Sequence, residues 1–80
     1  MMQTIYKVEA FWDHEVAVWV AESEDILGLV TEAATLDQLT EKLKQIIPEL
    51  LDANQLIPYG SKDNIAFELI THRQELIQVA

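Results

Sequence analysis

A single apolar stripe between Leu36 and Leu51 limits what this chain can fold into more than any other feature. Leucine and isoleucine recur there at helical spacing, and charged or amide side chains fill the positions between them. The stripe consists of Leu36, Leu39, Leu43, Ile46, Ile47, Leu50 and Leu51. Because the chain has only 80 residues, we expect one small domain over residues 1–80, in which this helix packs on a sheet.

The ends of the helix carry recognisable signals. Thr35 is followed three residues later by Gln38, the spacing of a capping box, so the helix is expected to begin between them. Pro48 has no N–H to donate to the carbonyl of Lys44 and crowds that turn. The apolar stripe continues beyond it, which favours a kink over a break. Residues 53–64 are rich in turn-forming side chains and predict a loop.

Two segments before the helix alternate with the period of a β-strand. In residues 5–12 one side carries Tyr6, Val8, Ala10 and Trp12. Residues 16–23 repeat the pattern, and the intervening Asp13, His14 and Glu15 suit a three-residue loop or a tight turn with a bulge, which predicts an antiparallel hairpin. Both sides of the second strand are apolar, so we expect it to be central and covered on both faces.

Further strands are predicted at residues 29–32, where Gly28 can supply a bulge or an unusual φ, and at residues 65–71. Residues 75–80 suit a short edge strand or a frayed end. A right-handed crossover places the last strand parallel to the first, which gives an α+β fold with sheet order 3-2-1-4.

One helix covers one face, so Ile5, Phe11 and Trp19 are expected on the other face, covered by self-association or by a partner.

Charge and composition exclude several classes of function. The chain has 5 Lys+Arg against 14 Asp+Glu, a formal net charge of −9, which argues against direct binding to DNA or RNA. It has no cysteine, which favours a reducing compartment. No apolar run reaches membrane-spanning length and the start lacks a signal-peptide pattern, so we expect a cytoplasmic protein without a membrane partner.

One short stretch concentrates the negative charge. Glu22, Glu24, Asp25 and Glu32 occur there without a single Lys or Arg between them. Such a run is either a solvated loop kept soluble by repulsion or a docking patch for a basic partner, since opposite charge speeds encounter.

Candidate catalytic groups do not form a convincing set. Glu9 and Glu68 are on predicted strands and would need to share a face, whereas Asp37, Glu41 and Glu49 lie on the solvent side of the helix. His14 lies between Asp13 and Glu15 in a turn, where neighbouring side chains diverge, and His72 and Arg73 are adjacent near the chain end. We therefore expect a non-enzymatic domain with no metal and no cofactor.

Several of these segments resemble the HicB-like antitoxin superfamily, in particular its small stand-alone domains. The similarity covers roughly residues 5–72 and is most specific from Asp25 to Leu39, where a loop, Gly28, a short strand and Thr35 precede the helix. The resemblance implies a partial RNase H-like β-β-β-α-β fold. It also implies an antitoxin that masks a small basic RNA-cleaving toxin.

The sequence departs from the HicB pattern at two motifs. Asp25-Ile26-Leu27-Gly28 stands where relatives commonly have Asp-x-Pro-Gly, and Ala33-Ala34 replaces a Gly-acid pair. The C-terminal DNA-binding segment of many relatives has no counterpart before Ala80, so no separate DNA-binding domain is expected. The alternative hypothesis is an orphan homo-oligomer with a structural or regulatory role and no toxin.

Overall fold

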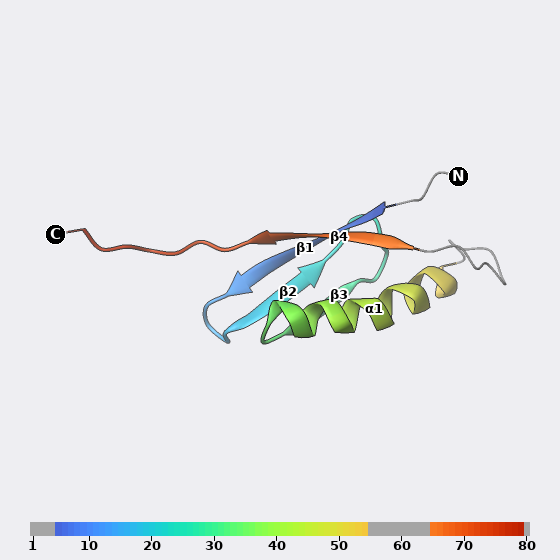
Figure 1. Ribbon diagram of the computed structural model, residues 1–80, viewed down its shortest axis with the longest axis horizontal. Helices are drawn as coiled ribbons and strands as arrows, with labels where there is room; N and C mark the ends of the chain where they lie inside the picture. The colour runs from blue at the N-terminus through green and yellow to red at the C-terminus, as the bar shows by residue number, and fades with distance from the viewer. Residues whose placement is uncertain (1–4, 55–64, 80) are drawn as a thin grey trace.

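A computed structural model describes residues 5–54 and 65–79 and contains four strands and one helix (Figure 1). The predicted loop at residues 53–64 lies almost wholly outside the described residues. In chain order the elements are β1 (Ile5–Asp13), β2 (Val18–Glu22), β3 (Val30–Ala33), α1 (Leu36–Ala53) and β4 (Ala66–His72).

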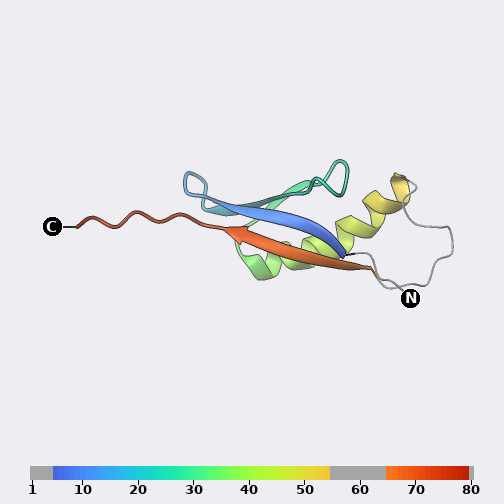
Figure 2. The same ribbon diagram turned by 90° about the horizontal axis from the view of Figure 1, so that it is seen from above.

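The four strands form one sheet in the order β3-β2-β1-β4. β1 pairs antiparallel with β2, β2 pairs antiparallel with β3, and β4 lies parallel to β1. The predicted α+β architecture, the sheet order 3-2-1-4 and the parallel closing strand are therefore confirmed. Helix α1 covers one side of this sheet, which we call the helix face (Figure 2). We call the opposite side, which α1 does not cover, the open face.

Local sequence signals set the limits of α1. The Thr35 hydroxyl accepts a hydrogen bond from the Gln38 amide at 3.1 Å, which satisfies one of the amides that have no partner in the first turn. The helix runs through Pro48 to Ala53 without a break. Its apolar stripe packs on the sheet and places four side chains in the core, namely Leu39, Leu43, Ile47 and Leu51.

The segment between β2 and β3 contributes to the core as well as to the acidic surface. Ile26 is fully buried and Leu29 is 2 % exposed. Gly28 between them has φ +85°, the left-handed backbone that a side chain resists, whereas a Cβ there would meet only Leu50 Cδ2 at 3.8 Å. Gly28 is thus needed for its conformation rather than for space, as the sequence predicts.

The β1–β2 hairpin differs from the prediction in one important respect. Its loop is residues 14–17, with Ala17 at φ 55°, so that Asp13 pairs with Val18 and Trp12 pairs with Trp19. A loop of residues 13–15 would instead have placed Trp12 opposite Val16. The observed and predicted registers differ by three residues. Because side chains alternate along a strand, a difference of an odd number of residues moves every β2 side chain to the other face.

The expectation that Trp19 lies on the uncovered face is therefore wrong. Trp19 lies on the helix face, 8 % exposed, with its ring centroid 5.3 Å from that of Trp12. Val18 and Val20 take the open face, where each is half-buried, so β2 is central but α1 covers only one of its faces. Ile5 and Phe11 lie on the open face as expected and are 56 % and 39 % exposed.

Beyond β4 the chain continues as an extended segment, residues 73–79, which we call the arm. The arm projects past the β1–β2 turn, in line with β4 and away from the body of the domain (Figures 1 and 2). All of its residues are exposed, and within the described residues it has no strand partner. Of the two expectations for the tail, the short edge strand is not observed, and the described residues form an extended end without strand pairing.

Candidate functional site

The open face combines negative charge with exposed apolar side chains. The strand registers place one glutamate from each strand on it: Glu9, Glu22, Glu32 and Glu68. Lys7 is the cation that the same registers place there, directly opposite Glu68. Ile5, Phe11 and Val20 lie among these charges. The face is thus an acidic surface with exposed apolar side chains between its charges.

Two of these glutamates oppose one another across neighbouring strands. Glu9 pairs with Glu22 in the β1–β2 register, and directly opposed like charges destabilise an antiparallel pair. His72 lies beside this pair: its Nε2 is 3.4 Å from Glu9 Oε1, and its ring stacks on Phe11 with centroids 4.7 Å apart.

The four acids of the predicted docking patch divide between two roles. Glu22 and Glu32 lie exposed on the open face, and Glu24 is exposed in the loop that follows β2. Asp25 instead accepts a hydrogen bond from the Lys7 amide at 2.8 Å. Its carboxylate therefore fastens the loop to β1. Contact between Glu22, Glu24, Asp25 or Glu32 and a partner remains a prediction.

Ser23 is a structural residue that the sequence did not single out. Its hydroxyl donates to the Lys7 carbonyl at 2.6 Å and accepts from the Asp25 and Ile26 amides at 3.1 and 3.2 Å. Together with Asp25 it satisfies both backbone groups of Lys7 beyond the last β1–β2 pair. A Ser-x-Asp sequence directly after a strand was the available signal, since both side chains commonly bond to nearby backbone.

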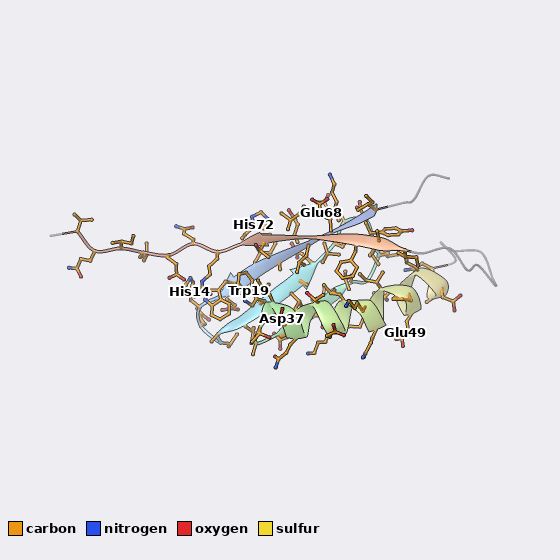
Figure 3. All side chains as sticks on the ribbon, viewed as in Figure 1. His14, Trp19, Asp37, Glu49, Glu68 and His72 are labelled. Carbon is orange, nitrogen blue, oxygen red and sulfur yellow. The ribbon has the colours of Figure 1, made fainter. Side chains whose placement is uncertain are left out.

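The carboxylates considered for catalysis lie on two sides of the sheet. Glu9 and Glu68 do share the open face, whereas Asp37, Glu41 and Glu49 are exposed on α1. Figure 3 shows Asp37 and Glu49 at opposite ends of the helix, about 18 Å apart along its axis at the usual rise per residue. Among residues 5–54 and 65–79, no group of three or more His, Asp or Glu side chains is placed to hold a metal ion.

The histidine in the turn has a structural contact. His14 Nε2 donates to the Gln74 carbonyl at 2.8 Å, and Asp13 Oδ1 accepts from the Glu15 amide at 2.9 Å. The three neighbouring polar residues therefore do not converge on one ligand. His14 and Gln74 are far apart in the sequence, and their bond joins the hairpin turn to the base of the arm.

Arg73 fixes the same region from the helix face. Its guanidinium lies 4.4 Å from the ring centroid of Trp12 and 5.9 Å from that of Trp19. Arg73 Nε also donates to Glu75 Oε1 at 2.6 Å, and this hydrogen bond lowers the pKa of the Glu75 carboxyl. His72 and Arg73 are exposed at the end of β4 and lie on opposite faces of the sheet, because consecutive strand residues point to opposite faces.

A shallow hollow lies where β3 meets the first turns of α1. It is lined by Ala33, Ala34, Asp37, Gln38, Glu41, Lys42 and Gln45. Lys42 Nζ donates to the Glu32 carbonyl at 2.6 Å, so its charge serves to join the helix to β3. In the described part of the chain, no buried side-chain nitrogen or oxygen lacks a hydrogen-bond partner.

The chain belongs to the family described as Domain of unknown function (DUF1902), whose model matches residues 5–79. It is also similar to a solved structure, the hypothetical protein TTHA1013 from the extremely thermophilic bacterium Thermus thermophilus. The two are 42% identical, with a TM-score of 0.67, and the match covers 95% of this chain and 100% of that one. No curated protein matches the chain. In the part of the chain that the structure describes, the helix is not long and apolar enough to cross a membrane.

Proposed function

We propose that this domain is a cytoplasmic, non-enzymatic protein-binding module of HicB-like antitoxin type, which masks a small basic RNA-cleaving protein. The observation that carries the proposal is the open face, where every strand contributes a glutamate and partly exposed apolar side chains lie between these charges. A basic partner would neutralise the opposed Glu9 and Glu22 and would cover Phe11.

Electrostatics sets the expected behaviour of such a complex. The net charge of −9 attracts a basic protein over a range that salt shortens, to about 8 Å at physiological ionic strength. Association should therefore be faster and tighter at low salt. The resemblance of residues 5–72 to HicB-like domains supports the kind of partner, a basic ribonuclease whose phosphate-binding surface the acidic face would occupy in place of RNA.

The experiment is an affinity capture from the native host at low ionic strength, with two matched variants of equal charge. Glu22→Gln/Glu32→Gln removes two charges from the open face, and Glu41→Gln/Glu49→Gln removes two from the outside of α1. We expect wild type and the helix variant to retain a small basic protein that cleaves RNA when released. The open-face variant should lose it at least tenfold.

Two results would remove the proposal. One is the absence of any basic ribonuclease among the retained proteins; the other is equal retention by both variants. The alternative function, an orphan homo-oligomer without a toxin, is favoured by a specific feature, the exposed apolar arm. In that case the bait would be recovered alone, with a mass above that of one chain.

A further inference from the structure

The arm is the most exposed apolar segment that the structure describes. Leu76, Ile77 and Val79 are 93%, 85% and 86% exposed, although the segment lies in line with a strand. Its base is held in that direction by the Arg73–Trp12 contact and by the His14–Gln74 hydrogen bond. Holding the backbone of the arm extended costs conformational entropy, and no backbone hydrogen bond to a neighbouring strand offsets this cost in the described residues. A strand from another chain would supply these hydrogen bonds.

β4 offers a matching unsatisfied edge. It is the outermost strand of the sheet and pairs only with β1, so its second edge is free among the described residues. On the helix face it carries Phe67 and Leu69, which are only half-buried because α1 comes closest to β3 and β2. A strand added beside β4 would satisfy its backbone groups and cover these two side chains.

From this complementarity we propose that the arm of one copy pairs antiparallel with β4 of a second copy, and that the two copies exchange arms about a two-fold axis. The pairing joins two identical edges, as closed two-fold symmetry requires. It is argued from the arm and the free edge of β4 and does not rest on the proposed antitoxin role. In each copy, residues 66–79 form one extended run about 46 Å long at the usual rise of a strand.

The side-chain pattern selects one register. Paired residues must lie on the same face, and in the register centred on Arg73 the apolar residues of the arm meet apolar residues of β4. Leu69 then opposes Ile77, Phe67 opposes Val79, and Ile70 opposes Leu76. Shifting one strand against the other by two residues keeps paired side chains on the same face. In one direction this shift puts Leu69 opposite Glu75, and in the other direction it puts Ile77 opposite Thr71.

Charge also favours this segment for self-association. Two copies of a −9 chain repel, but the arm itself is neutral because Arg73 and Glu75 cancel and are bonded at 2.6 Å. In the Arg73-centred register the two copies of Arg73 oppose one another, and each lies diagonal to Glu75 of the other copy, within reach of a second ion pair that offsets this repulsion. A perpendicular two-fold axis leaves both helices on one side of a continuous sheet and both open faces on the other.

Disulfide mapping tests the register directly, since the chain has no cysteine. Glu68 opposes Gln78 of the second copy, and both side chains are exposed, so Glu68→Cys/Gln78→Cys should oxidise to a covalent dimer at native concentration. The single variant Glu68→Cys is the matched control, because its two cysteines would be about 33 Å apart in the dimer. We expect at least tenfold more covalent dimer from the first variant. Equal yields, or no covalent dimer, would overturn the pairing.

Light scattering supplies the second measurement. Wild type should have twice the 9.1 kDa mass of one chain. Ile77→Lys should give the mass of one chain with an unchanged circular dichroism spectrum, since Ile77 supports nothing within its own chain, and the neighbouring Gln78→Lys should stay at twice that mass. A wild-type monomer refutes the proposal. So does a dimer that survives Ile77→Lys and dissociates with Phe11→Lys, which would place the interface on the open face.

Discussion

Replacing Trp19 by alanine tests the register of the β1–β2 hairpin, on which the composition of both sheet faces depends. Trp19 is 8 % exposed and packs against Trp12 and the core. Truncation of a buried aromatic residue to alanine typically costs about 3–5 kcal/mol. A domain of this length has a total stability of about 4–12 kcal/mol, so Trp19→Ala should remove a large part of it.

Phe11 provides the comparison, because it is an aromatic residue of β1 on the open face and is 39 % exposed. Less area returns to water on its truncation, and Phe11→Ala should cost only about 1–2 kcal/mol. The free energy of unfolding is measured by urea denaturation followed by far-ultraviolet circular dichroism. Trp19→Phe, at about 1–2 kcal/mol, keeps the comparison measurable if the alanine variant does not fold.

The reasoning would be refuted by one pattern in particular. If Trp19→Ala loses less than Phe11→Ala while changing the mass of the assembly, Trp19 is an interface residue and the register with Ala17 in the loop is incorrect. A change in the slope of the unfolding free energy against urea concentration would instead indicate altered compactness of the folded or unfolded state.

Three smaller perturbations follow from single contacts. Ser23→Ala removes three hydrogen bonds at the start of the acidic loop and should lower the free energy of unfolding by about 1–3 kcal/mol in urea denaturation, whereas Ser23→Thr keeps the hydroxyl and should lose less. Thr35→Ala removes the cap of α1 and should cost about 1 kcal/mol in the same assay, with Thr35→Ser as its control; an unchanged midpoint would deny the cap a role. Because Arg73 lowers the pKa of Glu75, the contribution of that pair is present above the unfolded-state pKa of the carboxyl and is lost as pH falls through the folded-state value. A carboxyl titration by NMR should show the pKa of Glu75 returning toward its ordinary value in Arg73→Gln, and an unchanged titration would contradict the contact.

The candidate surface was only partly visible before the fold was known. The sequence identified Glu22 and Glu32 as acidic and close in the chain, and the sheet registers add Glu9 and Glu68 to the same face. These four come from all four strands, so no local pattern could group them. Asp25, in contrast, was grouped with the acids by proximity alone and has a backbone amide as its partner.

What the sequence determined by itself are the features whose causes are local. The spacing of Leu39, Leu43, Ile47 and Leu51 specifies a helix with one buried stripe. Thr35 caps the start of this helix, because its hydroxyl accepts a hydrogen bond from the amide of Gln38, three residues later. Alternation specifies the strands, and the handedness of crossovers then leaves the order 3-2-1-4 as the expected arrangement. These signals act over a few residues and do not depend on the rest of the chain.

Tertiary structure decided the features that depend on register and on distant partners. Both sides of β2 are apolar, so the pattern could not tell whether Trp19 or Val20 faces the helix; the four-residue turn ending at Ala17 decides it through the pairing of Trp12 with Trp19. The direction of the arm likewise depends on His14 and Trp12, some sixty residues earlier in the chain. The energy of a side chain on a strand depends on what lies opposite it, and only the folded sheet supplies that neighbour.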